Sequence, residues 1–283
     1  MDTRLAMRAA CGVALTSVLA GAAAAEVRWY SSVEALLLTP KTNSQGFNNF
    51  FYAEAPVNVE TKSSYANSME GGVRFVGGFE DSCCGFGGRV RYFLFDNTVD
   101  YRSVWDSGTP VSLSGGVGVD VDAFDCEVTQ RGEFRKWDLL VAGGLRYGGV
   151  DVRENSGLFS GLSAAVFFGP TGVSFDGVGP TFAGEARREL GASGLSIVGR
   201  ARTALLFGDI DIASAFHGGG AISIEDEFVQ VWEFQFGLAY DHDCSFGTAT
   251  CGVFWEAQRW DSESNALGDL ALHGLSLMGG ITF

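Results

Sequence analysis

Apolar and polar side chains alternate along the last fourteen residues of the chain. Between Leu270 and Phe283, large apolar residues recur at every second position, with mostly glycine, serine or threonine between them. A period of two places alternate side chains on opposite faces of a β-strand. One face of this strand is therefore apolar and the other is small and polar. That combination is typical of a strand in an outer-membrane β-barrel.

The same alternation recurs along the chain after residue 26 and predicts ten strands. Most of these segments are long enough to cross a bilayer at a tilt. They are residues 27–38, 69–79, 86–96, 117–129, 136–150, 175–189, 195–208, 227–241, 250–261 and 270–283. Segments 47–59 and 158–168 could also be strands, which would give twelve. The pattern thus predicts an all-β fold, a transmembrane antiparallel β-barrel of about ten strands.

The connections between these segments alternate in length. The odd-numbered ones mostly have about twenty residues or more, with the ninth, 262–269, as the exception, whereas the even-numbered ones have five to eight. Outer-membrane barrels have long external loops and short periplasmic turns. The rotation of lengths therefore supports a barrel and places both chain ends on the periplasmic side.

The first 25 residues have the pattern of a secretory signal peptide. Arg4 and Arg8 form a short positive region before an apolar stretch, and small residues follow it up to Ala25. We expect removal of residues 1–25, leaving residues 26–283 as a single barrel domain. An exported soluble β-sandwich or lipocalin-like barrel is the alternative. The formal net charge of −15 argues against nucleic acid as a partner.

Charged residues fall on one face of the predicted strands. An Arg or Lys that faces lipid at mid-depth costs about 2–4 kcal/mol, so this face should line the lumen. The predicted lumen-lining charges are Glu34, Glu70, Arg74, Arg89, Arg91, Asp125, Glu127, Arg146, Glu185, Arg187, Arg200, Arg202, Glu233 and Glu256. Opposite signs also fall on neighbouring strands, as with Arg91 and Asp125, and such cross-strand pairs are favourable.

The opposite face of the predicted strands is apolar and should meet lipid. Its residues are Val73, Phe75, Val90, Tyr92, Leu94, Leu139, Val141, Leu145, Tyr147, Leu195, Ile197, Leu205, Phe207, Trp232, Phe234, Phe236, Leu238 and Tyr240. Five tryptophans lie mostly near strand ends, which predicts an interfacial aromatic girdle. They are Trp29, Trp137, Trp232, Trp255 and Trp260.

Five cysteines follow residue 25. Cys244 and Cys251 flank a short turn and are the best candidates for a disulfide, because the cell envelope is oxidising. A bridge between the adjacent Cys83 and Cys84 would be strained, and a bridge between the two turns is a further alternative. The spacing contains no Cys-x-x-Cys pair and no Cys/His cluster. We therefore predict no metal site and no cofactor.

One loop contains residues that could belong to an enzyme. His217 lies near Asp209 and Asp211 in a predicted external loop, but a catalytic base must lie within hydrogen-bond reach of its partners. Gly218 to Gly220 favour a flexible loop instead. We expect no enzyme, with an outer-membrane hydrolase as a minor alternative.

Several segments, spread in order along the chain, resemble a known family. They are Trp29–Leu38, Phe175–Thr181, Glu185–Arg188, Arg202–Gly208 and Glu256–Trp260, followed by the terminal Phe283. Together they resemble the Legionella-type major outer-membrane protein, or pore-forming outer-membrane protein, family. The resemblance implies a β-barrel in the bacterial outer membrane that forms a passive pore, and it implies no catalytic residues.

The leading functional prediction is therefore a porin that lets small polar solutes or ions diffuse through a charged lumen. Expected partners are outer-membrane lipid and lipopolysaccharide, small solutes or ions, and further copies of the chain in a homo-oligomer. The alternative is a non-conducting structural or surface-interaction barrel. Ten strands enclose little space, and paired arginines and glutamates could fill it.

Overall fold

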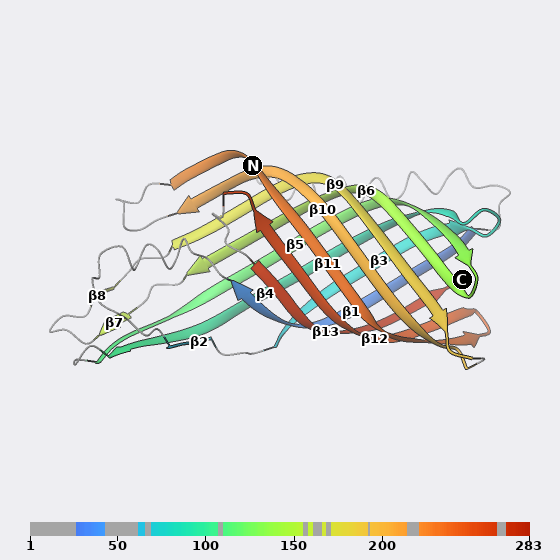
Figure 1. The fold of residues 1–283 in the computed structure, drawn as a ribbon, viewed down its shortest axis with the longest axis horizontal. Helices are drawn as coiled ribbons and strands as arrows, with labels where there is room; N and C mark the ends of the chain where they lie inside the picture. The colour runs from blue at the N-terminus through green and yellow to red at the C-terminus, as the bar shows by residue number, and fades with distance from the viewer. Residues whose placement is uncertain are drawn as a thin grey trace.

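The computed structural model describes residues 27–42, 62–65, 69–106, 110–154, 158–160, 166–167, 171–191, 193–213, 221–264 and 270–283. Within these ranges, ten antiparallel strands close into a barrel (Figure 1). They are β1 Val27–Thr42, β3 Glu70–Asp81, β4 Phe86–Asp106, β5 Pro110–Phe134, β6 Trp137–Glu154, β9 Thr171–Glu189, β10 Leu195–Ala213, β11 Ala221–Cys244, β12 Gly247–Ser262 and β13 Leu270–Thr282.

Every barrel strand is hydrogen-bonded on both sides. The ring runs β4-β3-β1-β13-β12-β11-β10-β9-β6-β5 and returns to β4. The first and last strands close it, with pairs from Tyr30 opposite Thr282 to Thr42 opposite Leu270. Closure leaves no unpaired edge, and a spanning sheet needs this because lipid cannot hydrogen-bond the backbone. The predicted ten-strand barrel is confirmed.

Three short strands lie outside the ring. β2 (Lys62–Tyr65) pairs with β4, β7 (Leu158–Ser160) pairs with β5, and β8 (Val166–Phe167) pairs with β7. Segment 158–168 is therefore partly β-structure, but it adds no strand to the barrel. Segment 47–59, residues 1–25 and His217 lie outside the described residues.

The four short connections lie at one end of the barrel, together with Val27 and Phe283. The tightest are two-residue turns, such as Arg135-Lys136 between β5 and β6, where Phe134 pairs with Trp137. Arg135 has a φ of 59°, and the favoured two-residue hairpins have a positive φ at the first turn residue because this matches the strand twist. This is the periplasmic end in the usual orientation of such barrels.

The opposite end of the barrel is uneven. β4 and β5 have 21 and 25 residues, and their hairpin extends beyond the other strands (Figure 1). β1 and β12 have 16 residues each. Strands on the β4–β5 side thus continue past the level at which the other wall ends. Among the described residues, no helix is long and apolar enough to cross a membrane.

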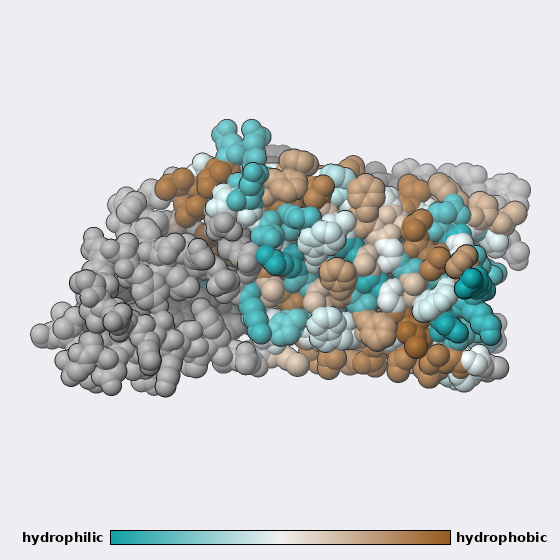
Figure 2. All heavy atoms as spheres, viewed as in Figure 1, coloured by the Kyte–Doolittle hydropathy of each residue, from teal (hydrophilic) through white to brown (hydrophobic). Residues whose placement is uncertain are grey.

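The outer wall is apolar where the strands alternate. Most of the largest predicted lipid-facing side chains are exposed: Phe75, Leu139, Val141, Leu145, Phe207, Trp232, Phe234, Phe236, Leu238 and Tyr240. The other predicted members are half-buried between them. Figure 2 shows apolar side chains along this wall, with hydrophilic ones gathered toward both of its ends. The exposed fraction of Leu145 reaches 62%, which suits contact with lipid chains rather than water.

Candidate functional site in the barrel lumen

The inner face changes character along each strand. On β1, Glu34, Leu36 and Leu38 are all buried, whereas Ala35 and Leu37 between them are exposed. These three buried residues share one face because side chains alternate in a strand. The inward face is therefore charged near mid-strand and apolar beyond it, toward the end with the long connections. The same change on other strands divides the lumen into layers.

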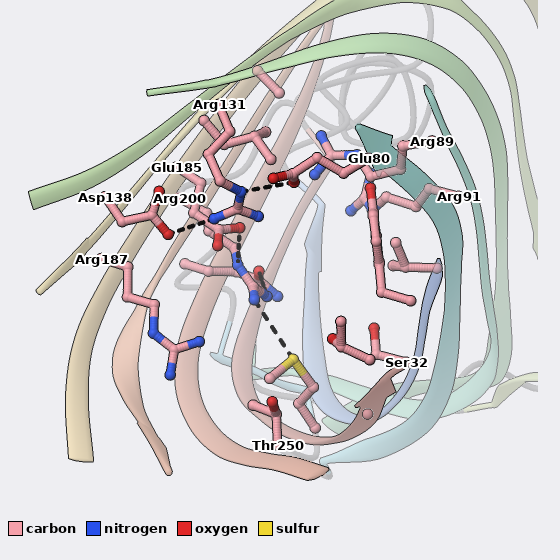
Figure 3. Close-up of a pocket in the computed structure, with 18 of the residues that line it drawn as sticks. Ser32, Glu80, Arg89, Arg91, Arg131, Asp138, Glu185, Arg187, Arg200 and Thr250 are labelled. Atoms are coloured by element: carbon pink, nitrogen blue, oxygen red, sulfur yellow. Dashed lines mark hydrogen bonds and ion pairs between the residues drawn. The ribbon is translucent and has the colours of Figure 1, made fainter. Parts of the chain in front are cut away.

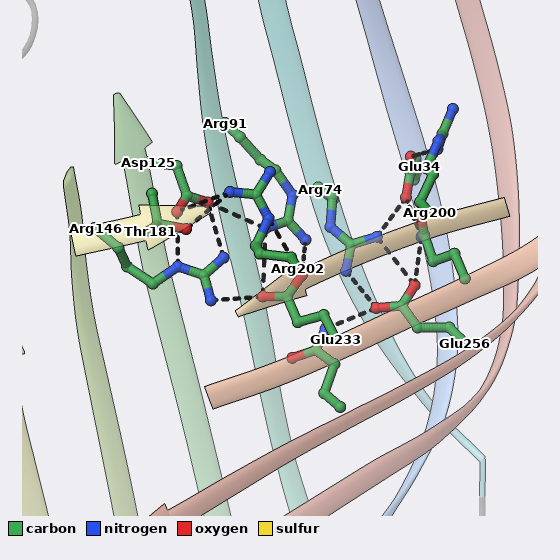
Figure 4. Close-up of polar contacts among 12 residues, drawn as sticks. Glu34, Arg74, Arg91, Asp125, Arg146, Thr181, Arg200, Arg202, Glu233 and Glu256 are labelled. Atoms are coloured by element: carbon green, nitrogen blue, oxygen red, sulfur yellow. Dashed lines mark hydrogen bonds and ion pairs between the residues drawn. The ribbon is translucent and has the colours of Figure 1, made fainter. Parts of the chain in front are cut away.

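We call the buried ionic group at mid-depth the charged layer. It consists of Glu34, Arg74, Arg91, Asp125, Glu127, Arg146, Arg202, Glu233 and Glu256, each at most 8% exposed. Figure 4 shows most of these side chains pointing toward one another from strands on all sides of the barrel. Buried charges are stable only when each is paired and hydrogen-bonded. The charges of this layer are paired with one another across the strands.

One half of the charged layer is centred on Arg74 of β3. Its guanidinium forms ion pairs with Glu34 of β1 and Glu256 of β12. Gln235 of β11 donates through Nε2 to Glu34 at 3.0 Å and to Glu256 at 2.7 Å. Arg200 approaches Glu34 from the periplasmic side, with Nη1 3.0 Å from Oε1. Two carboxylates thus share two arginines and an amide.

The other half of the charged layer is centred on Asp125 of β5 and Glu233 of β11. Arg146 contacts both, with Nε 2.7 Å from Asp125 Oδ1 and Nη1 2.6 Å from Glu233 Oε1. Arg91 also contacts both, at 3.0 Å and 2.5 Å. Arg202 forms an ion pair with Glu127. Each carboxylate therefore accepts from more than one arginine.

Some of these ion pairs cross the lumen. Arg91 lies on β4 and Glu233 on β11, and four strands separate them in either direction around the ring. A bond of 2.5 Å between side chains on opposite walls leaves no room for water between them. The charged layer therefore ties the walls together and fills the lumen at this depth.

The apolar layer lies next to the charged layer, toward the long connections. It consists of Leu36, Leu38, Phe93, Phe95, Val119, Val121, Ala123, Val150, Val152, Phe175, Ala204, Leu206, Ile210, Val229, Val231, Trp260, Leu270 and Leu272. All are at most 5% exposed. The interior of this barrel is thus packed with hydrocarbon at this level, as in a soluble core.

Trp260 is the largest side chain in the apolar layer. A Cβ built on Gly148 of β6 would lie 3.0 Å from Trp260 Cη2, and β12 and β6 are separated by β11, β10 and β9. The indole therefore reaches across the lumen to a wall where a glycine makes room for it. The prediction that Trp260 belongs to an interfacial girdle is wrong. Its even number on β12, shared with Glu256 and Gln258, was the signal for an inward position.

The predicted lumen charges mostly converge. Arg89 and Glu127 pair at 2.8 Å, as their neighbouring strands predicted, and Arg200 pairs with Glu185 at 2.8 Å. The register also places Arg91 opposite Asp125 and Arg202 opposite Glu233. Arg187 pairs with Asp241 nearer the short turns. Glu70 is opposite Leu38 at the far end of β3 and lies outside the charged layer.

A cavity opens between the charged layer and the short turns. Its volume is about 540 Å³, and Figure 3 shows charged side chains projecting into it from facing walls. The charged layer and the apolar layer close the lumen on its other side, so this cavity has one polar mouth, at the periplasmic end. Sequence patterns marked the charges but gave no indication of where open space would remain.

The predicted disulfide between Cys244 and Cys251 is wrong. Both thiols are free. Cys251 pairs with Tyr240 and Cys244 pairs with Gly247, so the two cysteines are offset by four residues along the ladder. That offset corresponds to roughly 13 Å, and disulfide Cα atoms lie within about 7 Å. Within the described residues, no group of three or more metal-ligating side chains could hold an ion.

A family model matches residues 23–268 of the chain, and its description is the Legionella pneumophila major outer membrane protein precursor. The chain belongs to the Legionella major outer membrane protein family. The resemblance predicted from the sequence is confirmed. A search of curated proteins gave no match.

A comparison with solved structures finds a similar fold in an outer-membrane protein. The outer membrane protease OmpT from Escherichia coli matches with a TM-score of 0.55 at 8% identity, over 90% of this chain and 96% of that one. The translocator domain of the autotransporter NalP from Neisseria meningitidis matches with a TM-score of 0.37 at 12% identity, over 99% of this chain and 95% of that one. The CymD monoaromatic hydrocarbon channel matches with a TM-score of 0.28 at 7% identity, over 90% of this chain and 87% of that one.

Family membership and the OmpT-like fold place the protein in the bacterial outer membrane. The location predicted from the sequence is confirmed. At 8% identity the likeness to OmpT is one of fold, and it transfers no activity.

Proposed function

We propose that this protein is a non-conducting outer-membrane barrel, whose lumen is closed by the charged and apolar layers. Its functional surfaces are then the two ends rather than a channel between them. The observation that carries the proposal is the ion pair between Arg91 and Glu233, which joins opposite walls at 2.5 Å. The apolar layer follows directly behind it.

The two layers oppose permeation for different physical reasons. An ion at the charged layer would have to break hydrogen-bonded, desolvated pairs, and removing one partner of such a pair typically costs about 3–5 kcal/mol. An ion at the apolar layer would lose its hydration shell and gain no ligand, which is how hydrophobic constrictions block pores. The barriers act in series, so opening either one alone is insufficient.

The test is conductance of the refolded protein in planar lipid bilayers. The proposal predicts no current steps above the empty bilayer, at protein amounts for which gel mobility shows folded barrels in the membrane. Stepwise, reproducible conductance from the wild-type protein would contradict it.

A passive pore is the second candidate. The polar cavity beneath the charged layer favours it, because porins have a charged aqueous interior. In that case the wild type would conduct, and Arg200→Ala, which removes a charge from the cavity wall, would shift ion selectivity. A closed barrel predicts zero conductance for both proteins.

The proposal assigns no catalytic role. A surface hydrolase would depend on His217, which lies outside the described residues. His217→Ala should leave peptide and lipid hydrolysis by the purified protein unchanged at background level. An activity that the wild type has and this variant lacks would require the hydrolase alternative instead.

A further inference from the structure

We propose that the periplasmic cavity is a binding site for zwitterionic amino acids or short peptides. This inference rests on the proposed function, because a closed lumen makes the cavity a cup with one mouth rather than a segment of a channel. Its volume of about 540 Å³ lies within the range of about 300–1,000 Å³ that small-molecule sites occupy.

The charge of the cavity wall selects the class of ligand. Eight arginines and eight carboxylates line it, so its formal net charge is zero despite the density of charges. A simple anion or cation would meet as many repelling groups as attracting ones. A ligand with one positive and one negative group can place each of them beside a wall residue of opposite charge, which is the usual basis of electrostatic complementarity.

The charges are also separated across the mouth. The wall of β1, β3 and β4 carries four arginines, Arg28, Arg74, Arg89 and Arg91, against two acids, Glu34 and Glu80. The wall of β5, β6 and β9 carries two arginines, Arg131 and Arg187, against four acids. Those four acids are Glu133, Asp138, Glu185 and Glu189. Figure 3 shows Arg89 and Glu80 on one side of the cavity and Asp138, Glu185 and Arg187 on the other.

Two polar atoms on these walls have no hydrogen-bond partner. They are the hydroxyl of Tyr30 on β1 and Oδ1 of Asp138 on β6, and both residues line the cavity. Both atoms are buried, so the orientation of a ligand follows from the net charges of the walls, positive on β1–β4 and negative on β5–β9. The ligand's carboxylate therefore belongs on the β1–β4 wall and its ammonium on the β5–β9 wall.

The rim residues allow a test that leaves the fold intact. Arg28 and Glu189 are exposed, and no ion pair joins either of them to another described residue. β1 and β9 are on opposite sides of the ring, with β13, β12, β11 and β10 between them on one side. An extended tripeptide spans about 10 Å, long enough to bring its two ends toward opposite walls.

The experiment is calorimetric titration of the full-length mature barrel in a non-ionic detergent. The probes are triglycine, N-acetyl-triglycine, triglycine amide and the doubly blocked N-acetyl-triglycine amide. Triglycine should bind at least about tenfold more tightly than any of the blocked probes, because only it satisfies both walls. Equal binding of all four probes, or binding of none, would overturn the proposal.

Charge-neutralising variants assign the two ends. Arg28→Gln should weaken binding of triglycine and N-acetyl-triglycine and leave triglycine amide unchanged. Glu189→Gln should weaken binding of triglycine and triglycine amide and leave N-acetyl-triglycine unchanged. Arg188→Gln is the matched control for the first variant, because Arg188 lies outside the cavity over the Trp137 ring. Glu225→Gln, an exposed position at the other end of the barrel, is the control for the second.

The binding test and the conductance test fail independently. A conducting wild type that still distinguishes triglycine from its blocked forms would refute the closed lumen and retain the zwitterion site. A silent wild type that binds none of the four probes would retain the closed lumen and refute the site. Weakening by Arg188→Gln equal to that by Arg28→Gln would show general charge effects and would also refute the site.

Discussion

At the scale of single residues, the charged layer depends on arginines that each serve more than one carboxylate. Arg74 is 1% exposed and pairs with Glu34 and Glu256 on two other strands. Arg153, at the outer end of β6, pairs with Asp151, and its side chain is 61% exposed. Burial, rather than the number of ion pairs, should therefore decide what each arginine contributes to stability.

Arg74→Met should lower the free energy of unfolding by about 3–5 kcal/mol, because it leaves two buried carboxylates short of a cation. Arg153→Met should change it by less than about 1 kcal/mol, as for other solvent-screened pairs. Urea unfolding in lipid vesicles, followed by tryptophan fluorescence, measures both. Similar small losses for the two variants would mean that water reaches the charged layer.

Gly148 makes room for the Trp260 side chain in the apolar layer. A Cβ on Gly148 would lie 2.9 Å from Leu206 Cδ1 and 3.0 Å from Trp260 Cη2. Gly148→Val should therefore overpack the apolar layer and destabilise the barrel by about 1–3 kcal/mol. Combining it with Trp260→Phe should recover much of that loss in the same unfolding assay. Additive losses would show that the two residues do not compete for one space.

At the scale of elements, the hairpins are fixed by turn chemistry and by the faces of their strands. Alternation found the ten strands, but it placed several turns too broadly, as with 130–135 between β5 and β6. The ladder continues through polar residues up to a two-residue turn. Backbone hydrogen bonding extends strands beyond the apolar pattern, because it does not depend on side-chain hydropathy.

Arg135→Gly should stabilise the β5–β6 hairpin by about 0.5–1 kcal/mol, because glycine adopts a φ of 59° without the steric cost of a Cβ. Lys136→Gly is the matched control. Lys136 occupies the same turn with a negative φ, and there glycine adds only unfolded-state entropy and should destabilise. Equal effects of the two changes on unfolding would contradict this account of the turn.

At the scale of the whole molecule, closure of the ring brings together charges that are up to 182 positions apart in sequence, such as Arg74 and Glu256. Neighbouring-strand pairs could be predicted from register alone. Pairs across the lumen, such as Arg91 with Glu233, depend on barrel diameter and on which side chains reach the axis. A narrow ten-strand barrel brings opposite walls within reach of two long side chains.

The two layers predict how conductance could be created. Trp260→Ala with Phe93→Ala opens the apolar layer, and Arg91→Ser with Glu233→Ser opens the charged layer. Each double variant should remain silent in planar bilayers, because the other layer still closes the lumen, whereas the fourfold variant should conduct. Circular dichroism must first show that the variants keep their β-structure. Conductance from either double variant would show that a single layer is the seal.

By itself the sequence determined the fold class, the strand number, the compartment and the family, because alternation of side chains and loop length are local properties that a membrane strictly enforces. It also determined which charges face inward. It did not determine whether the lumen is open. That depended on inward apolar residues such as Leu36 and Trp260, whose hydropathy resembles that of lipid-facing neighbours. Only the closed ring decided it, because filling of a lumen depends on side chains from opposite walls meeting at one depth.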